Sequence, residues 1–360
     1  MNRRFSFVAF LLLLSLVAGC ASQASAPDAG ASVSSSAPAA DSSEETPDET
    51  TQEEPAPSDA VRGVTGLYGE ELLVPATVDT IISLAPSTTE LLTDLGLSEK
   101  IVAVDTYSAA DYADILPAGI PAFDMMNPDN EQIVALNADI VFTTGMSYAW
   151  GEDVFASARE AGVFIIDIES PSSLQEIIDS IVFIGDCAGE RATAEEIAQE
   201  MEAFLSAVHT VMDTTDFEHR RTILFELSSP TPDYPMIYSV GPGSYIDEIL
   251  SLTGGDNIAS GADSPWPALD EEWAVAQDPE VILTTEDYIP DIVDVLLSLP
   301  GWEGVTAIQN GDVYLIDGNR INRPNHRVCG AILEIGLILY PGLFEDIADP
   351  FADEALPNAA

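Results

Sequence analysis

The chain has 360 residues, and its 62 acidic side chains outnumber its 11 basic ones, which gives a formal net charge of −51. Nucleic acids and anionic membrane surfaces bind through basic patches, so this charge balance argues against both as partners. The sequence also lacks the G-x-S-x-G, H-E-x-x-H, P-loop and G-x-G-x-x-G motifs, and its three histidines are too few for a multi-histidine zinc or manganese site.

The first twenty residues are typical of a targeting segment rather than of a fold. Arg3 and Arg4 precede an apolar run, Phe7–Val17, that is too short to span a bilayer comfortably, and the segment ends in Val-Ala-Gly-Cys20. This ending resembles a bacterial lipobox, which implies that Cys20 is lipidated; the alternative is an ordinary secretory signal that happens to carry a cysteine. Two or more acyl chains anchor a protein stably. We therefore expect residues 1–20 to be a lipoprotein signal peptide and the protein to be extracytoplasmic, held on the cell membrane through Cys20.

Residues 21–62 form the expected linker. They consist mostly of Ala, Ser, Pro, Thr, Asp and Glu, and up to Asp59 the one large apolar residue is Val33. Such a composition buries too little surface to offset the entropy lost on ordering, and its acidic residues repel one another. We expect a disordered, extended tether that holds a soluble domain away from the membrane.

Residues 75–190 predict an N-terminal α/β lobe. A capping box, Ser87–Glu90, is expected to open a helix that stops at Gly96. The expected strands are Thr80–Pro86, Ile101–Asp105, the apolar end of residues 129–144 and Val163–Ile168. Strands that alternate with helices predict a mostly parallel sheet covered on both faces.

A sixteen-residue pattern occurs twice in the same register. Residues 129–144 read DNEQIVALNADIVFTT, and residues 270–285 read DEEWAVAQDPEVILTT. Each copy predicts a short acidic helix, a turn and an apolar strand that ends in Thr-Thr. A unit that recurs once, at a spacing of about 140 residues, is too widely spaced for a solenoid. The repeat indicates two related α/β lobes, an arrangement that commonly holds a small molecule between them.

Residues 191–214 predict a connecting helix between the lobes. Thr193 and Glu196 form a second capping box, and apolar residues keep helical spacing over Thr193–Val211, where a flexible linker would carry Gly or Pro. A second α/β lobe is expected over residues 220–347, followed by a tail, 348–360. Its expected elements are the strands Thr222–Leu227 and Met236–Val240, the helix Tyr245–Leu252, the second repeat copy, Asp291–Leu299, the strand Val313–Asp317 and the helix Val328–Tyr340. The predicted fold is therefore two Rossmann-like α/β lobes bridged by one long, rigid helix.

Besides Cys20, the chain contains Cys187 and Cys329, which fall in different predicted lobes. A disulfide between them would join the lobes covalently, whereas buried free thiols are the alternative that we favour for so sparse a cysteine content.

Three of the eleven basic residues, Arg320, Arg323 and Arg327, lie within eight positions of one another. In so acidic a chain this cluster indicates a site for an anion. Its alternative is local structure, such as carbonyl capping or carboxylate pairing, and this alternative is strongest for Arg327.

Several segments carry motifs of a known family. They are ISLAPSTTELLTDLG (Ile82–Gly96), NPDNEQIVALNADIV (Asn127–Val141), LTGGDNIA (Leu252–Ala259), PWPALDEEW (Pro265–Trp273) and the ending RPNHR…LYPGLF. From about Thr80 to Phe344 the chain resembles the iron-chelate/vitamin B12 family of ABC-transporter substrate-binding proteins, whose two α/β lobes are joined by one long helix. The Pro-Trp-Pro stretch is especially close to the B12-binding members.

The resemblance implies a monomeric receptor without an intrinsic cofactor. It would capture a metal chelate, namely a ferric siderophore, haem or a cobalamin-type corrinoid, in a cleft between the lobes and deliver it to a membrane permease and its ATPase subunits. A surface hydrolase on a similar two-lobe fold is the alternative, but it would need an activated nucleophile beside a base. A third class, an adhesion or structural lipoprotein, would not need the Pro-Trp-Pro stretch or paired docking acids.

In that family one surface glutamate on each lobe docks into arginine-lined sockets of the permease. The matching motif positions here are Glu131 and Glu272, which the internal repeat also pairs. Two carboxylates, one on each lobe, would let the permease hold both lobes through charge-assisted hydrogen bonds. The alternative is two solvated acids favoured by the helix dipole.

The family's cleft is lined by loops at the carboxyl ends of the strands. Here this implies contacts from Tyr107, Met125, Met126, Tyr148, Trp150, Tyr245, Trp266, Arg320, Arg323 and His326. Aromatic and methionine side chains suit a flat macrocycle or chelate, although each is also a common core residue.

The sequence departs from the B12-binding pattern at several of these positions. Met125 and Thr144 stand where those members place tryptophans, and Arg320 and Arg323 replace less basic residues. These departures favour a chelate with carboxylates or other anionic groups over cobalamin. His326, with Met125 or Met126 opposite, is a candidate axial ligand if the chelate is haem; otherwise His326 caps the final helix.

Overall fold

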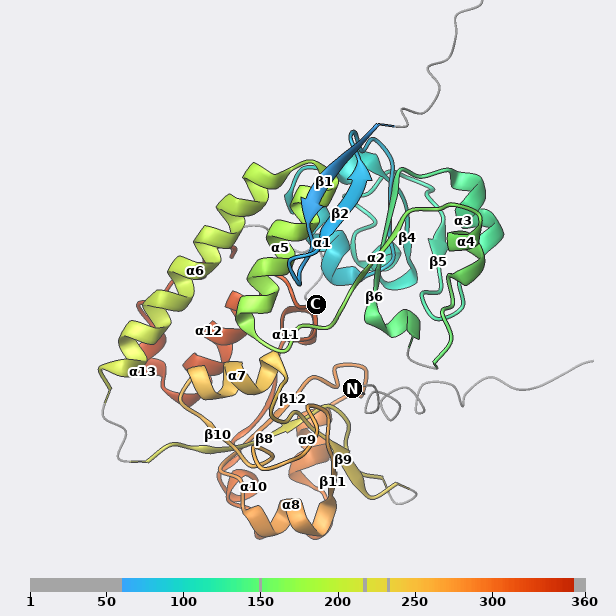
Figure 1. Cartoon of the computed structure of the whole chain (residues 1–360). Helices are drawn as coiled ribbons and strands as arrows, with labels where there is room; N and C mark the ends of the chain where they lie inside the picture. Colours follow the sequence, from blue (N-terminus) through green and yellow to red (C-terminus); the bar gives the residue numbers. More distant parts are fainter. Residues whose placement is uncertain (1–59, 149–150, 216–218, 232–233, 353–360) are drawn as a thin grey trace, which may run out of the picture.

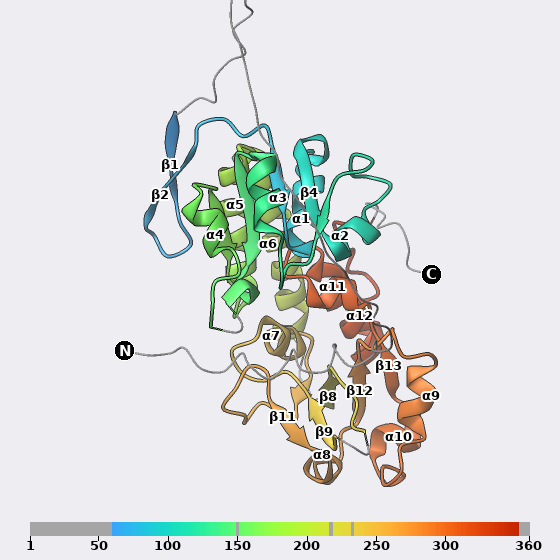
Figure 2. The ribbon, with the colours of Figure 1, turned by 90° about the vertical axis from the view of Figure 1, so that its right-hand side faces the viewer.

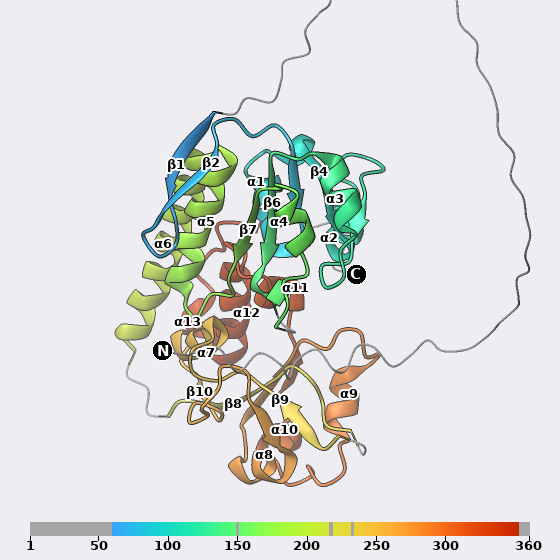
Figure 3. The ribbon, with the colours of Figure 1, turned by 45° about the vertical axis from the view of Figure 1, so that its right-hand side comes forward.

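The computed structural model describes residues 60–148, 151–215, 219–231 and 234–352. These residues form two α/β lobes, one above the other in Figures 1 and 3, with the long helix α6 (Arg191–Asp213) along one side. The predicted fold class is confirmed. No helix in the described ranges is long and apolar enough to cross a bilayer. The predicted signal peptide, the linker up to residue 59 and Trp150 lie outside the described residues.

The upper lobe, here the N-lobe, is built on a five-stranded parallel sheet in the order β5-β4-β3-β6-β7. Its strands are β3 (Ile81–Ser83), β4 (Ile101–Asp105), β5 (Ala122–Phe123), β6 (Ile140–Thr144) and β7 (Ile165–Ile168). Its helices are α1 (Pro86–Asp94), α2 (Thr106–Asp111), α3 (Asn130–Leu136) and α4 (Ala156–Glu160), with 3-10 turns at Ser98–Lys100 and Gly145–Tyr148. Parallel neighbours require crossover connections, and the helices between the strands supply them.

The lower lobe, here the C-lobe, contains a four-stranded parallel sheet in the order β10-β8-β12-β13. These strands are β8 (Thr222–Glu226), β10 (Asp256–Asn257), β12 (Val281–Thr284) and β13 (Val313–Leu315), and β9 (Met236–Tyr238) pairs antiparallel with β11 (Ala268–Asp270). The helices are α7 (Tyr245–Leu252), α8 (Glu271–Gln277), α9 (Ile292–Leu297), α10 (Thr306–Asn310), α11 (Gly318–Asn322), α12 (Val328–Leu339) and α13 (Pro341–Phe344). Figure 2 shows α11 between the two lobes.

The sequence repeat is also a structural repeat. Asp129 caps α3 by accepting a hydrogen bond from the Gln132 amide (3.0 Å), and Asp270 caps α8 in the same way through the Trp273 amide (3.0 Å). Both helices end in a left-handed residue, Asn137 at φ 48° and its counterpart Asp278 at φ 49°. Short polar residues tolerate this conformation, which turns the chain into the central strands β6 and β12.

One apolar core runs through both lobes. It includes Ile81 from the N-lobe sheet, Ile181 from α5 (Leu174–Ala188), Met201 from α6, Ile332 from α12 and Phe225 from the C-lobe sheet. The opposite face of each sheet packs into a smaller core of its own lobe, so neighbours such as Ile81 and Ile82 lie in different cores. This alternation follows from the two-residue period of a strand. Because the lobes share buried surface, they are not independent bodies joined only by α6.

The connecting helix α6 packs against a second, antiparallel helix, α5. Helix α5 was not expected from the sequence; Ser173 caps it, and it ends at Gly189, where φ is 87°. The two helices approach closely because Gly185 of α5 has no side chain, since a Cβ atom there would lie 2.2 Å from that of Ala194. The long helix α6 itself is present as predicted, and its buried stripe faces this shared core.

Both predicted capping boxes are wrong. Helix α1 starts at Pro86 after Ala85, without a side-chain cap, because Pro supplies the helical φ angle that the first turn needs. Helix α6 starts at Arg191, before the predicted Thr193, and again without a side-chain cap.

The fold also extends beyond the range expected for it at each end. An antiparallel hairpin, β1 (Val61–Thr65) and β2 (Glu71–Pro75), precedes the N-lobe, so β1 takes in the last two residues of the range 21–62 that was expected to be linker. At the other end, Phe351 of the predicted tail is buried against the ring of His326.

Candidate functional site

The carboxyl ends of both sheets lie at the boundary between the lobes. In the N-lobe, β3 and β4 lead into α1 and α2; in the C-lobe, β13 leads into α11. Residues 323–327, which follow α11, contact α1 and α2 directly. Loops at the carboxyl ends of parallel strands are where α/β folds bind ligands. The two edges therefore enclose the candidate site.

On the N-lobe side, a buried carboxylate terminates β4. Asp105 accepts hydrogen bonds from the amides of Tyr107 and Ser108, both at 2.9 Å, and so caps α2. A row of hydroxyl groups continues from it, from Ser108 to Thr89 (3.0 Å) and from Thr89 to Ser83 (2.8 Å). Burial raises the pKa of Asp105, while its hydrogen bonds lower it in part. This polar row gives the N-lobe edge fixed donors and acceptors.

On the C-lobe side, two glutamates lie together at the ends of β8 and β12; we call Glu226 and Glu286 the acid pair. Glu226 is 1% exposed and Glu286 is 3% exposed. The Ser229 amide donates to Glu286 Oε2 (2.8 Å), and the Tyr288 hydroxyl donates to Glu286 Oε1 (2.6 Å). Glu226 Oε2 has no hydrogen-bond partner among the described residues. Burial, and then the charge of Glu286, raise the pKa of Glu226 to about 8, although the hydroxyls of Ser229 and Thr284 lower it in part. Glu226 therefore holds a proton at neutral pH.

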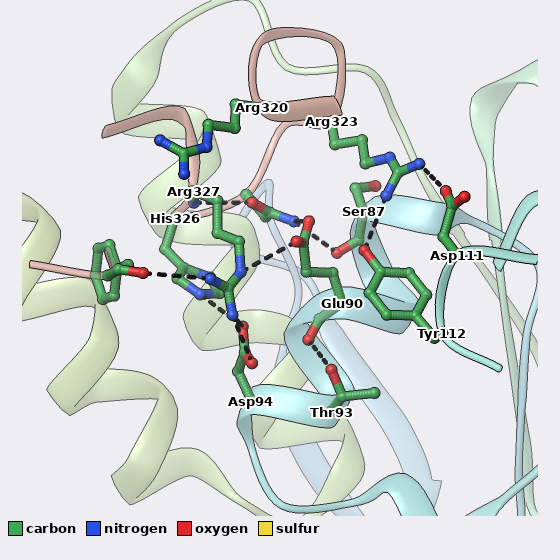
Figure 4. Close-up of polar contacts among 12 residues, drawn as sticks. Ser87, Glu90, Thr93, Asp94, Asp111, Tyr112, Arg320, Arg323, His326 and Arg327 are labelled. Atoms are coloured by element: carbon green, nitrogen blue, oxygen red, sulfur yellow. Dashed lines mark hydrogen bonds and ion pairs between the residues drawn. The ribbon is translucent and has the colours of Figure 1, made fainter. Parts of the chain in front are cut away.

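A buried polar network joins the lobes next to these edges (Figure 4). This interlobe cluster consists of Glu90 and Asp94 on α1 and of Asn325, His326 and Arg327 ahead of α12. Arg327 Nε lies 3.0 Å from Glu90 Oε1, and its Nη2 donates to both Asp94 oxygens at 2.9 and 2.8 Å. Asn325 Nδ2 donates to Glu90 Oε2 (2.8 Å). Such bidentate, desolvated pairs fix geometry strongly, so the cluster holds the C-lobe against α1.

The structure gives three of the predicted ligand contacts in the loop after β13 partners within the protein. Arg323 donates to the Tyr112 hydroxyl (2.9 Å) and pairs with Asp111, so its guanidinium is occupied by the N-lobe. Arg320 lies apart from Glu90 in Figure 4 and pairs with Asp317 (3.3 Å) and more distantly with Asp349 (3.7 Å). Both arginines are thus paired with carboxylates of the protein, as is Arg327.

His326 is not an axial ligand in this arrangement. Its side chain is fully buried, its Nε2 lies 2.8 Å from Asp94 Oδ2, and its ring packs edge-on against Phe351. A ligand has no access to a ring enclosed in this way. His326 contributes to the interlobe cluster instead.

The remaining predicted contacts divide into buried and accessible residues. Tyr245 is core: it is buried, and its hydroxyl donates to the Ile321 carbonyl (2.7 Å), which fixes α7 to α11. Tyr107 begins α2 and is 57% exposed, and Tyr148 ends the turn after β6 and is 45% exposed. The half-buried residues Met125, Met126 and Trp266 complete the described set. Tyr107 and Met125 follow the neighbouring strands β4 and β5, so they lie on the same part of the N-lobe edge.

Glu131 and Glu272 occupy equivalent exposed positions in the two lobes. Each lies in the first turn of its helix, α3 or α8. The preceding residue anchors each helix start: Asn130 donates to the Val154 carbonyl (2.9 Å), and Glu271 accepts from the Trp302 ring nitrogen (2.9 Å). The exposed carboxylates are thus presented from fixed helix ends.

Both cysteines of the described residues are free and buried, so the expectation of free thiols is confirmed. Burial, and then the neighbouring Asp186, raise the pKa of Cys187 to about 12, and burial raises the pKa of Cys329 as well. Neither thiol is suited to nucleophilic chemistry.

A surface hollow of about 420 Å³ lies elsewhere, between the hairpin β1–β2 and the helices α5 and α6. It is lined by residues such as Leu67, Ile178 and Glu202 and contains none of the strand ends described above. We do not assign the ligand site to it.

Sequence reasoning missed the acid pair. A signal was present, since Glu226 ends the apolar strand TILFE and Glu286 follows the Thr-Thr that ends the second repeat copy. In a chain with 62 acidic residues, two glutamates after apolar strands attract no notice. Only the pairing of β8 with β12, which places Glu226 opposite Thr284, brings them together.

Known proteins resemble this chain along most of its length. A family model described as periplasmic binding protein matches residues 81–319. The chain is 26% identical over 269 residues to YvrC of Bacillus subtilis, an uncharacterized ABC transporter substrate-binding lipoprotein, covering 74% of this chain and 81% of the relative. It is also 26% identical to the vitamin B12-binding protein of Vibrio cholerae, in a match that covers 73% of this chain and 90% of the relative. The structure of the periplasmic heme-binding protein RhuT from Roseiflexus sp. RS-1 shares the fold, with a TM-score of 0.62 at 23% identity. The match covers 74% of this chain and 99% of RhuT.

Proposed function

Since the chain belongs to the periplasmic binding protein family, it is a binding protein rather than an enzyme, and we propose that it is the lipid-anchored receptor of an ABC importer for a metal chelate. The observation that carries this proposal is the meeting of two parallel sheets, carboxyl edge to carboxyl edge, at the lobe boundary. The names of the relatives agree with it: one is an ABC transporter substrate-binding lipoprotein and another binds vitamin B12. The alternative of a hydrolase finds no support among these relatives, which are named as binding proteins.

The chelate class is a ferric siderophore, a corrinoid or haem. Both Arg320 and Arg323 are paired with acids of the protein, so they give no reason to favour an anionic chelate over a neutral one. The accessible aromatic and methionine side chains after β4, β5 and β6 still suit a flat or bulky chelate.

A melting experiment tests the receptor function. The full-length protein is heated with ferrioxamine B, cyanocobalamin or haem, and the absorption spectrum of each chelate is recorded before and after incubation. A receptor shows a ligand-dependent rise in melting temperature with the chelate unchanged. A chemically altered chelate, or no stabilisation by any of the three, contradicts the proposal.

For delivery, Glu131 and Glu272 are the proposed contacts with the permease, one on each lobe. Glu131→Ala and Glu272→Ala should leave chelate affinity intact and impair uptake and permease binding, because exposed acids contribute little to folding while interface charge pairs are worth several kcal/mol. Glu200→Ala, an exposed acid on α6, is the matched control. Loss of chelate affinity in either docking variant contradicts the assignment.

For anchoring, we propose that Cys20 carries the lipid. Cys20→Ser should move the protein from the membrane fraction to the soluble extracytoplasmic fraction, because the remaining signal segment is too short to hold it in the bilayer. Retention of Cys20→Ser in the membrane fraction contradicts lipid anchoring at this residue.

A further inference from the structure

Among the residues that the structure describes, the acid pair has no basic partner. Across the ranges that the structure describes, every lysine and arginine contacts an acid or a backbone carbonyl at some other place. No ion pair joins Glu226 or Glu286 to any of them. Two buried carboxyl groups side by side are costly unless a cation or hydrogen-bond donors compensate them. The protein leaves this compensation incomplete at the edge where a ligand would bind.

The hydrogen bonds around the pair show which oxygen atoms remain for a ligand. Glu286 is fixed by the amide and hydroxyl of Ser229 on one oxygen. Among the described residues, its other oxygen accepts only from the hydroxyl of Tyr288, whose side chain is 71% exposed. Glu226 Oε2, buried beside it, has no partner among the described residues. Burial, and then the hydrogen bond to Glu286 and the charges of both glutamates, raise the pKa of Tyr288, so a donor that takes the place of its hydroxyl would lie next to Glu286 and near Glu226.

We propose that Glu226 and Glu286 form a subsite that binds a nitrogen–hydrogen donor of the transported chelate, either an ammonium or a carboxamide group. The inference rests on the proposed receptor function and names the substrate chemistry within it. Charge-assisted hydrogen bonds from such a donor would satisfy both carboxyl groups at once. Haem is disfavoured, because its pendant ionisable groups are carboxylates, which this pair repels.

Ferrioxamine B provides a direct probe, since this ferric chelate carries a free ammonium group that acetylation removes without changing the metal-binding part. Calorimetric affinities of the full-length protein are compared for ferrioxamine B, its N-acetyl derivative, cyanocobalamin, which carries carboxamides, and haem. The variants are Glu226→Gln and Glu286→Gln, which keep the side-chain shape. Glu280→Gln is the control, because Glu280 holds Thr222 at the opposite, amino edge of the same two strands.

With ferrioxamine B, we expect each acid-pair variant to bind about tenfold more weakly or worse, and Glu280→Gln to bind as the wild type does. The N-acetyl derivative should bind the wild type more weakly and respond less to the substitutions. Ammonium binding near pH 7 should also release a proton, seen as a dependence of the measured heat on the buffer. If cyanocobalamin is the chelate that binds, Glu286→Gln should weaken it without proton release, and Glu226→Gln should have the smaller effect because glutamine resembles the protonated acid. This pattern identifies the carboxamide as the donor.

Two results contradict the acid-pair subsite without contradicting the receptor function. One is a nitrogen-bearing chelate whose affinities for the wild type and both acid-pair variants agree within about twofold. The other is binding of haem without binding of either nitrogen-bearing chelate. Binding of none of the four chelates contradicts the receptor function itself, and the subsite falls with it. Circular dichroism of each variant shows that a lost affinity does not arise from unfolding.

Discussion

Replacing Glu226 with glutamine should remove a large part of the pH dependence of folding stability. In the folded protein, burial and the charge of Glu286 raise the pKa of Glu226 from 4.5 to about 8. Between these two values the folded protein holds a proton that the unfolded chain has lost. The folded state then binds more protons than the unfolded state, so the free energy of unfolding falls as the pH rises through this window. Glutamine keeps the shape of the protonated acid and has no proton to lose.

The size of the effect follows from the shift. Each pKa unit corresponds to about 1.4 kcal/mol, so the full shift amounts to roughly 5 kcal/mol, of which about 3 to 4 kcal/mol is lost between about pH 5 and about pH 8. The stability of the variant minus that of the wild type should therefore increase by this amount over the same range. Taking the difference cancels the other groups that titrate in both proteins.

Urea unfolding followed by circular dichroism at several pH values measures this difference. Glu200→Gln, at an exposed position on α6, is the control and should give a difference that changes little with pH. A Glu226→Gln difference that is constant with pH, or that falls as the pH rises, would show that Glu226 is not held protonated by its surroundings.

Three further predictions follow from the core and the interlobe cluster. Arg327→Met should destabilise the protein by about 3–5 kcal/mol in urea unfolding, because it leaves Glu90 and Asp94 buried without their cation; an effect below about 1 kcal/mol would mean that the cluster is not desolvated. Cys187 and Cys329 should react with a thiol reagent only as fast as the protein unfolds, since both are buried and their pKa values are raised; rapid labelling of the native protein would contradict this. Small-angle scattering with and without saturating chelate should show only a small change in radius of gyration, because the lobes share a core; a closure of tens of degrees would refute a rigid connection.

Local sequence patterns predicted the helices and strands whose apolar residues recur with a clear period. The strand Ile101–Asp105 and the helix Tyr245–Leu252 have the bounds expected from their apolar patterns, and the repeat identified equivalent helices and central strands in two lobes. Helix α5 was missed although its sequence carries the signal. Gln175, Asp179 and Asp186 lie along one accessible side at helical spacing, and Ser173 caps its start.

The site was harder to predict, because its polar groups find their partners far along the chain. Glu90 has the spacing of a capping residue, yet its carboxylate accepts from Asn325, 235 positions away. Arg323 has the chemistry of an anion-binding residue, but its partners, Asp111 and Tyr112, lie more than 200 positions before it. A sequence shows that such groups need partners, whereas only the packing of the lobes decides whether a ligand or the protein provides them.

The shared apolar core also bears on how fast a captured ligand escapes. Opening the lobes widely would expose buried side chains from α5, α6 and α12 to water, which makes it a rare event. With the ligand bound between the lobes as proposed, its dissociation should depend on local movements of the loops at the lobe boundary rather than on a hinge. Unloading at a transporter then requires the transporter to distort or displace these loops, so the residence time of the ligand should be long in the free receptor and short in the docked one.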